Sequence, residues 1–300
     1  MEVKVSDVFS AVELADLNRR SDWRGLGQLA AHLGIMVASG WLWHWSLSHH
    51  SPWGVLVLPV YGFSFASMFA ALHECGHRTA FASRWLNDGV AWLAGVLSFY
   101  NSAFYRRYHA WHHRYTQIPG KDPELEDPVP TTRLAYLWQM SGLPWWWGKL
   151  RGHLRVLLGN FQSYPYISPE ARGEVRRSTA LQFGVYGVLL LISGLAHQPW
   201  FFTHWLLPLA VGQPLLRLIL IAEHTGCSYD SNPFTNTRTT LTLWPVRLLM
   251  WNMPFHAEHH FSPGIPFHAL PLAHVKLRQK LLHVAPGYVA VNRQILLNLG

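Results

Sequence analysis

The sequence predicts an all-α integral membrane protein with four membrane-spanning helices in two hairpins and a cytosolic helical cap that holds a histidine-rich site. Three observations favour this class. Only 13% of the 300 residues are charged, and 50% are hydrophobic, whereas a soluble domain carries about 25% charged residues. Two long stretches contain no charge at all, and short histidine clusters follow the ends of these stretches.

The charge-free stretches run from residue 25 to 73 and from 178 to 216. A helix needs about 20 residues to cross about 30 Å of hydrocarbon, and each stretch is about twice that long. Each has a polar, turn-prone centre, so we interpret each as a hairpin. The predicted spans are 26–47, 53–72, 179–196 and 200–221. Two buried hairpins of a soluble α-protein are the alternative, which is disfavoured because soluble helices need a charged outer face.

The 24 Lys and Arg residues predict the orientation, because the hairpin tips carry none of them. The positive-inside rule then places both termini and the central loop in the cytoplasm. We expect one domain over 1–300, with these parts: a cytosolic segment 1–25, a hairpin 26–72, a cytosolic region 73–178, a hairpin 179–221 and a cytosolic region 222–300. Basic residues that flank spans explain the net charge of +8, so we expect membrane lipids and no nucleic acid as partners.

Eight histidines form three boxes whose spacing is i, i+4 or i, i+3, i+4. These are His73 and His77; His109, His112 and His113; and His256, His259 and His260. On a helix these spacings place the imidazoles within one turn, and the topology places all three boxes on one side of the membrane. His224 is a ninth candidate on that side. The other ten histidines, His274 among them, are assigned to capping, packing or interface anchoring.

Clustered neutral imidazoles are typical of a transition-metal site. Eight or nine exceed the needs of one ion, since zinc takes four ligands and usually three protein ligands in a catalytic site. We therefore predict two ions. Iron is favoured because imidazole suits it and because it can activate O2, the expected co-substrate. Two Cys exclude a four-Cys iron–sulfur cluster and a disulfide scaffold.

The order and spacing of the boxes between paired spans resemble the membrane fatty acid desaturase superfamily. The resemblance covers roughly residues 50–280 and is strongest at 73–81, 109–125 and 224–271. It implies that the eight box histidines bind two irons, and His224 matches the additional histidine of the family. It also implies a four-span fold with an acyl tunnel into the cap, and O2-dependent desaturation of a lipid acyl chain. The expected location is a bacterial inner membrane.

Three features depart from the family pattern. Leu220 stands where the acyl-CoA branch has an Asn, so a water-mediated Asn ligand is not supported. Ser262 replaces the aromatic residue that often precedes Pro263. No cytochrome b5-like His-Pro-Gly-Gly motif is present, so we expect an external electron donor of the ferredoxin, rubredoxin or cytochrome b5 type, with its reductase.

Other functions remain open at this point. The box pattern also suits a hydroxylase, a carotenoid ketolase or hydroxylase, or a fatty acid decarboxylase that makes terminal alkenes. His73-Glu-Cys-Gly-His77 matches the zinc protease motif, with Glu74 as general base, but this leaves the other boxes unexplained. A metal carrier would need ligands within the spans, whereas the three boxes are placed on one side of the membrane, which argues against this alternative.

Carboxylates near the boxes are candidates to orient the histidines, because a ligating histidine usually donates its other N–H to a carboxylate or carbonyl. Those adjacent to boxes or to His224 are Glu74, Glu223 and Glu258, and those further along are Asp88, Asp122 and Asp230. We expect Glu74 and Glu258 either to contact the ligand histidines or to lie on the surface. We expect Trp145–Trp147 to form an interfacial belt. Tyr105, Arg106 and Arg107 are candidates to bind a substrate headgroup or to anchor the protein at the membrane surface.

Overall fold

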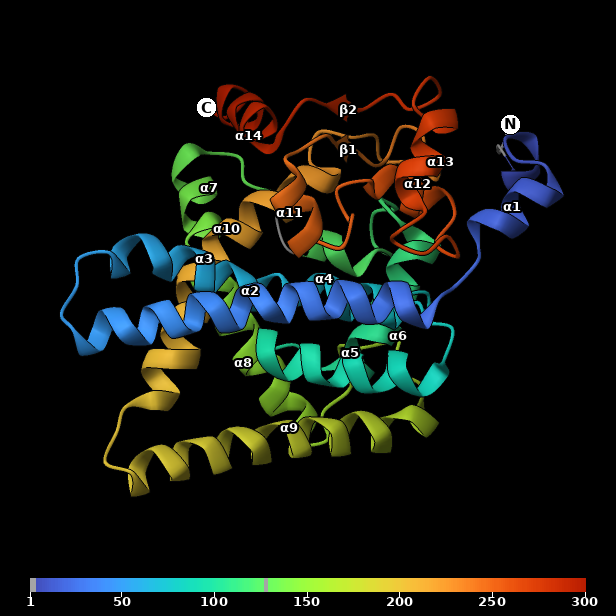
Figure 1. Ribbon diagram of the computed structural model, residues 1–300. Coiled ribbons are helices and arrows are strands. Elements are labelled where there is room, and N and C mark those ends of the chain that lie inside the picture. The colour runs from blue at the N-terminus through green and yellow to red at the C-terminus, as the bar shows by residue number, and fades with distance from the viewer. Residues whose placement is uncertain (1–3, 127–128) are drawn as a thin grey trace.

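The computed structural model describes residues 4–126 and 129–300, and its regular structure is mainly helical (Figure 1). The helices are η1 (Val5–Asp7), α1 (Ala11–Leu17), α2 (Asp22–Ser48), α3 (Gly54–Ala66), α4 (Met68–Gly76), α5 (Arg84–Ser98), α6 (Ser102–Tyr115), η2 (Pro123–Glu126), α7 (Arg133–Met140), α8 (Leu143–Leu157), α9 (Pro169–Leu195), η3 (Phe202–Leu206), α10 (Leu207–His224), α11 (Trp244–Leu249), α12 (His256–Phe261), α13 (Leu270–Leu277) and α14 (Tyr288–Leu297). Two short strands, β1 (Thr239–Thr240) and β2 (Val284–Ala285), pair in parallel. This ladder is a small departure from the predicted all-α class.

Three helical stretches are long and apolar enough to cross a membrane, namely 54–76, 169–195 and 202–224. They correspond to three of the four predicted spans. The fourth, α2, has 27 residues but does not meet the same hydropathy criterion, because His32, His44 and several Gly and Ser residues lower its mean hydropathy. Its outward side chains are nevertheless mostly apolar, with Val37 and Trp41 at least 65% exposed. A fourth span along α2 stays a prediction.

The two hairpins point the same way. Figure 1 shows the turn between α2 and α3 and the turn between α9 and η3 at the same end of the molecule, at the left of the view. The first histidine box lies at the other end of its hairpin, because α4 continues to Gly76. The arrangement agrees with boxes that share one side of the membrane.

The helices extend beyond the predicted spans at the ends that carry the charged residues and the box histidines. The helix α9 begins at Pro169, about ten residues before the predicted span, because proline is favoured in the first helical turn. Both α4 and α10 run past the predicted ends of their spans, so His73 and His224 lie in last helical turns.

The crossing of α3 and α10 connects the two hairpins and brings their backbones into close contact. A Cβ atom at Gly212 would lie 2.0 Å from the carbonyl oxygen of Gly62, and one at Gly62 would lie 2.2 Å from the carbonyl oxygen of Pro208. Small residues allow such close backbone approach between membrane helices. The crossing fixes α4, which bears His73, relative to α10, which bears His224.

Gly212→Ala should therefore destabilise the protein. Overpacking costs about 1–3 kcal/mol, and backbone atoms cannot move aside as a side chain can, so we expect the upper end of this range. Thermal unfolding in detergent measures the effect. Gly194→Ala is the matched control, because a Cβ there meets no atom within 4 Å. Equal melting temperatures for the two variants would contradict the close crossing.

Candidate metal centre

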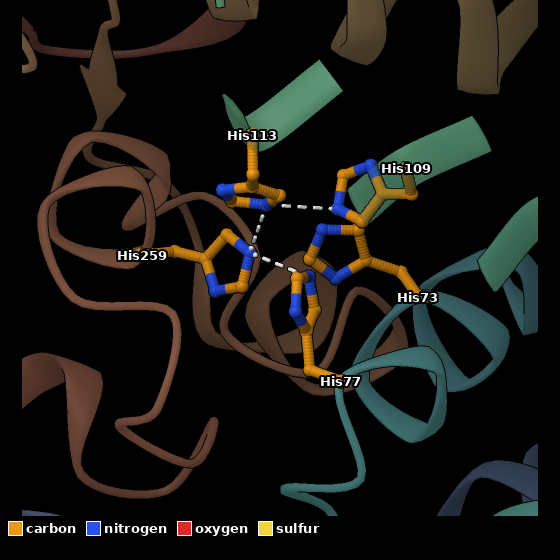
Figure 2. Close-up of side chains that lie close together, drawn as sticks. All are labelled: His73, His77, His109, His113 and His259. Atoms are coloured by element: carbon orange, nitrogen blue, oxygen red, sulfur yellow. Dashed lines mark hydrogen bonds between the residues drawn. The ribbon is translucent and has the colours of Figure 1, made fainter. Parts of the chain in front are cut away.

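Five histidines from three helical segments converge in a first group, which we call site 1 (Figure 2). They are His73, His77, His109, His113 and His259. Each offers one ring nitrogen, and these atoms all lie within 4.8 Å of one another. The end of α4 supplies two of the rings, α6 supplies two, and α12 supplies one.

The distances within site 1 fit a shared metal ion. The Nε2 atom of His259 lies 3.2 Å from that of His77 and 3.0 Å from that of His113, which in turn lies 3.0 Å from that of His109. A metal–imidazole bond of about 2.1 Å puts two ligands at right angles about 3.0 Å apart. In addition, the Nε2 atom of His73 is buried without a hydrogen-bond partner among the described residues. Unpaired buried nitrogens are costly unless a ligand satisfies them.

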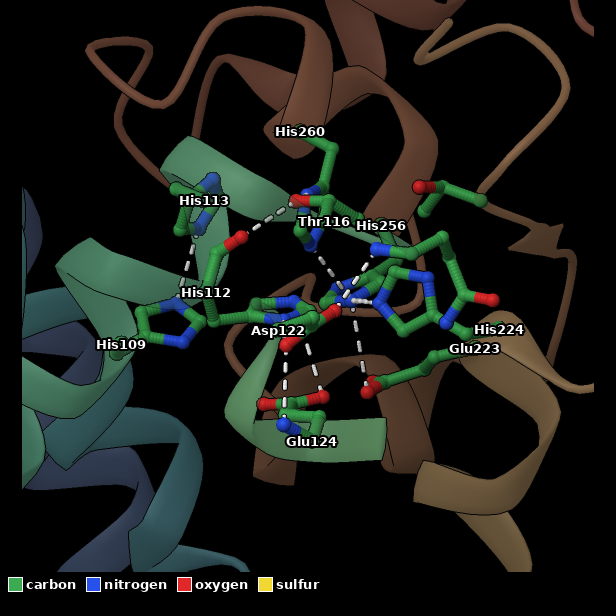
Figure 3. A network of polar contacts seen from close by, with 12 residues as sticks. His109, His112, His113, Thr116, Asp122, Glu124, Glu223, His224, His256 and His260 are labelled. Carbon is green, nitrogen blue, oxygen red and sulfur yellow. Dashed lines mark hydrogen bonds and ion pairs between the residues drawn. The ribbon is translucent and has the colours of Figure 1, made fainter. Parts of the chain in front are cut away.

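The remaining four histidines form a second group, site 2 (Figure 3). Ligand atoms of His112, His224 and His260 lie within 4.8 Å of one another. The Nε2 atom of His256 joins them, at 3.2 Å from that of His224 and 3.1 Å from that of His260. The two sites are neighbours, because the rings of His113 and His260 stack with centroids 4.2 Å apart.

Each three-histidine box divides between the two sites. In the second box His109 and His113 face site 1 and His112 faces site 2, whereas in the third box His256 and His260 face site 2 and His259 faces site 1. The i, i+4 pair shares one stripe of a helix and the middle residue is rotated away from it. All nine predicted residues thus lie together, and each three-histidine box contributes side chains to both groups.

In three of the four site 2 histidines, His112, His224 and His260, the Nδ1 atom contacts a neighbouring group, which leaves Nε2 free to bind a metal. His112 donates from Nδ1 to Asp122 at 2.8 Å, and His224 to the carbonyl of Asn236 at 3.0 Å. The Nδ1 atom of His260 lies 3.2 Å from the hydroxyl of Thr116. Such contacts fix the tautomer and the ring direction.

Two further carboxylates lie against site 2. An oxygen of Glu124 lies 3.7 Å from Nε2 of His112, and an oxygen of Glu223 lies 3.5 Å from Nε2 of His256. Burial raises the pKa of Glu124. The sequence indicated that Glu223 lies near the site, because Glu223 is next to His224. The sequence did not indicate Glu124, which follows Asp122 in the turn after α6, because no spacing rule connects Glu124 to a box.

Burial keeps most of these imidazoles neutral. It lowers the pKa of His109, His113, His256, His259 and His260 well below the ordinary value, and neighbouring histidines add to the effect. His112 differs: burial alone would lower its pKa, but Glu124 and Asp122 outweigh burial and raise it. Neutral imidazole is the form that binds metal, so the protein presents ready ligands at neutral pH.

Glu74 and Glu258 are buried, but neither contacts a box histidine. Glu74 accepts hydrogen bonds from the Thr79 hydroxyl and, at 2.9 Å, from the backbone N–H of Phe267. Its carboxylate therefore ties the first box to the loop after the third and leaves a zinc-protease arrangement without its general base. Glu258 contacts the Thr239 hydroxyl and Nδ1 of His274, so His274 supports the third-box helix.

The other predicted polar residues serve elsewhere. Asp88 pairs with Arg78 and Arg106, and Arg107 pairs with Glu174 at 2.7 Å, so both arginines of the α6 segment are engaged with carboxylates. Asp230 accepts hydrogen bonds within its own turn. Of the three aspartates proposed, only Asp122 contacts a box histidine among the described residues.

Asp122→Asn should weaken metal binding at site 2. Loss of the carboxylate removes the charge that orients His112, and changes of this kind cost about 10- to 100-fold in metal affinity. Titration of apo protein with Fe(II) measures the weaker of the two binding steps. The control is Asp230→Asn, the same change in a surface turn; an identical titration for both variants would contradict the assignment.

A cavity of 560 Å³ adjoins site 2, with His224 and Glu124 in its wall. The rest of its lining is mostly aromatic and aliphatic. Trp145 lies in this lining and donates from Nε1 to the hydroxyl of Tyr100 at 3.0 Å, so it does not belong to an interfacial belt. Trp147, 66% exposed, fits that expectation.

The comparisons with known proteins point to one family. The sequence model of the fatty acid desaturase family matches residues 50–292. The chain is 27% identical over 260 residues to an sn-1 oleoyl-lipid 12-desaturase of Picosynechococcus, which covers 76% of this chain and 71% of the relative. It is 28% identical to the dihydrorhizobitoxine desaturase of Bradyrhizobium elkanii, in a match that covers 87% of this chain and 74% of the relative. It is also 28% identical to a sphingolipid delta(4)-desaturase DES1-like protein of Arabidopsis thaliana, in a match that covers 76% of this chain and 65% of the relative. The chain belongs to the fatty acid desaturase family and is a desaturase-type oxidoreductase.

Proposed function

We propose that this protein is an O2-dependent diiron desaturase that introduces a C=C bond into an acyl chain. The observation that carries the proposal is the convergence of nine histidines into two adjacent groups. Five and four imidazoles suit two ions, and the nitrogen-rich donor set with nearby carboxylates suits iron. Family membership adds the desaturase-type reaction.

His73, His77, His109, His113 and His259 would hold one iron, and His112, His224, His256 and His260 the other. When bound, the two irons supply the redox chemistry that lets O2 attack an unactivated C–H bond. The protein contributes position and environment. Asp122 and the Asn236 carbonyl orient two ligands, and the aromatic wall of the cavity keeps water from an acyl chain that lies beside His224.

The named relatives act on different molecules by their names: an oleoyl lipid, dihydrorhizobitoxine and a sphingolipid. Family membership therefore leaves the substrate open, and we propose an acyl substrate because the cavity beside site 2 is largely apolar. Hydroxylation or decarboxylation by the same centre are alternative outcomes. Mass spectrometry of lipids and volatile hydrocarbons from cells with and without the protein, with iron analysis of the purified chain, tests the proposal. Unchanged lipids and hydrocarbons, or a single zinc per chain, would overturn it.

We also propose a multi-pass protein with four spans, whose two termini and metal centre face the cytoplasm of a bacterial cell. A reporter fused after Gly300 or inserted near Thr131 should read cytoplasmic. One inserted near His50 or Gln198, at the hairpin tips, should read on the opposite side. The reason is that no Lys or Arg lies at the tips. A cytoplasmic readout near His50 would remove α2 from the set of spans.

A further inference from the structure

Site 2 differs from site 1 in the donor atoms that surround it. Site 1 gathers five imidazoles and site 2 gathers four. The ion pairs that the structure shows between carboxylates and box histidines all involve site 2, where Glu124 and Glu223 lie against the rings (Figure 3). One turn before His224 on α10, Leu220 lines the adjoining cavity and offers no donor atom. Site 2 thus has one imidazole fewer than site 1 and has carboxylates beside it.

Glu223 is a buried carboxylate with an unsatisfied oxygen. Its side chain is 10% exposed, and its Oε1 atom is buried and has no hydrogen-bond partner among the described residues. Its Oε2 atom lies 3.5 Å from Nε2 of His256, beyond the roughly 2.7–3.2 Å of an N–H···O hydrogen bond. The same nitrogen lies 3.2 Å from Nε2 of His224 and 3.1 Å from Nε2 of His260. Buried charges in proteins are paired or coordinate metals, and three donor atoms surround this nitrogen.

Glu124 approaches site 2 at His112. Its Oε2 atom lies 3.7 Å from Nε2 of His112, which is again too far for a hydrogen bond. That nitrogen is buried and has no hydrogen-bond partner among the residues that the structure describes, whereas Nδ1 of the same ring donates to Asp122. A nitrogen and an oxygen that lie this close without bonding to each other are placed to bind one ion between them.

The measured separations agree with ligands of a shared ion. Metal–ligand bonds of about 2.1 Å place two ligand atoms about 3.0 Å apart at a right angle and about 3.6 Å apart at 120°. The imidazole pairs of site 2, at 3.1 and 3.2 Å, correspond to the first angle. The two carboxylate–imidazole pairs, at 3.5 and 3.7 Å, correspond to the second. One ion can therefore contact both kinds of donor.

Two cations lie near these carboxylates. Arg217 interacts electrostatically with Glu124 and with Glu223, and Lys149 interacts electrostatically with Glu124. Arg217 directs a hydrogen bond elsewhere, because one of its Nη atoms donates to the hydroxyl of Tyr100 at 3.0 Å. Attraction at this longer range favours ionised carboxylates, and the ionised form is the one that binds a metal. The two cations are thus compatible with carboxylates that serve as ligands.

We propose that Glu124 and Glu223 are oxygen ligands of the ion in site 2, so that site 1 is an all-nitrogen site and site 2 is a mixed nitrogen–oxygen site. This inference rests on the proposed function, because it assigns further ligands to the same diiron centre. Imidazole together with carboxylate is a donor set that suits iron(II). Glu124 lines the cavity and its side chain is 34% exposed, so it is the ligand on the cavity side, and Glu223 is the buried one.

Metal titration and infrared spectroscopy of the purified protein test the proposal without turnover. Apo protein in detergent is titrated with Fe(II) without O2, and the spectrum of the apo form is subtracted from that of the loaded form. Protein labelled with ¹³C at the glutamate carboxylates identifies the glutamate bands. We expect metal-dependent carboxylate bands that shift with the label, because coordination changes the carboxylate stretching frequencies.

Glu223→Gln should weaken the site 2 binding step at least tenfold, because loss of a group that only orients a ligand already costs about 10- to 100-fold. It should leave the site 1 step unchanged and remove part of the metal-dependent bands at iron saturation. Glu124→Gln should have the same effects to a smaller extent, since this carboxylate is partly exposed. Glu124→Gln also keeps the test decisive if Glu223→Gln does not fold.

The matched control is Glu74→Gln, the same change at a buried carboxylate that follows a box histidine in sequence but bonds to Thr79 and Phe267. It should leave both binding steps and the glutamate bands unchanged. Spectra without metal-dependent glutamate bands would overturn the proposal. A weaker site 2 with unchanged bands in both variants would also overturn it, because the two carboxylates would then act only through their charge. Unchanged lipids and hydrocarbons in cells that make the protein defeat the proposed function separately, since the titration and the bands do not depend on turnover.

Discussion

Replacing any one of the eight box histidines with alanine should abolish turnover and reduce the iron content of the purified protein. Removal of a group that merely orients a ligand already costs about 10- to 100-fold, so we expect more than about a hundredfold loss when the ligand itself is removed. His224→Ala should behave in the same way. Iron analysis and product formation on the same preparations measure both effects.

The division of the boxes makes this prediction more specific. His113→Ala should weaken site 1 first, and His256→Ala should weaken site 2 first, although the two residues belong to different boxes. Each variant should retain up to one iron per chain at moderate iron concentration. Because the rings of His113 and His260 stack, the remaining site should also bind more weakly than in the wild type.

The control must be a histidine that is remote from the centre. His197→Ala serves, since His197 is exposed at a hairpin tip. His274 is unsuitable, because its contact with Glu258 supports α12 and its replacement can lower iron content indirectly. A box variant that keeps two irons and full turnover would remove that residue from the ligand set.

The sequence was sufficient to predict the hairpins and the convergence of the boxes because both depend on local patterns. Absence of charge over two span lengths forces a hairpin, and i, i+4 spacing forces neighbouring rings. The division of each box between two sites could not be predicted, because it depends on where α4, α6, α10 and α12 meet. That meeting is fixed by contacts such as Gly62 on Gly212, which no periodicity reports.

The roles of the carboxylates show the same limit. Glu74, Glu223 and Glu258 are equally close to histidines in sequence, yet of these three only Glu223 approaches one of the two histidine groups. Neighbouring residues on a helix point in different directions, so proximity in sequence favours none of them. Asp122 reaches His112 because the chain turns back after α6, and the backbone N–H groups of Gln117 and Glu124 hold its carboxylate there.

Purified protein supplied with O2 and NAD(P)H alone should be inactive until a reductase and a small electron carrier are added. Desaturation consumes two electrons from outside, since O2 takes four and the substrate supplies two. The 300 residues contain two Cys and no dinucleotide fingerprint or haem motif. Measuring product with and without ferredoxin, rubredoxin or cytochrome b5 tests this dependence. Full activity with NAD(P)H alone would defeat it.

The basic face that we propose to be cytosolic should then determine how well the carrier binds. Arg106 and Arg107 are paired with carboxylates, but other arginines between residues 78 and 177 are exposed, including Arg114, Arg151, Arg172, Arg176 and Arg177. Carriers of this kind tend to be acidic, and complementary charge steers a brief encounter. The Debye length is about 8 Å at 0.15 M salt, so higher ionic strength should raise the apparent KM for the carrier and leave kcat nearly unchanged. Arg176→Glu with Arg177→Glu should have the same effect at low salt, by about tenfold. If the two arginines only bind anionic lipids, this variant will dissociate from vesicles more readily and titrate with the carrier as the wild type does.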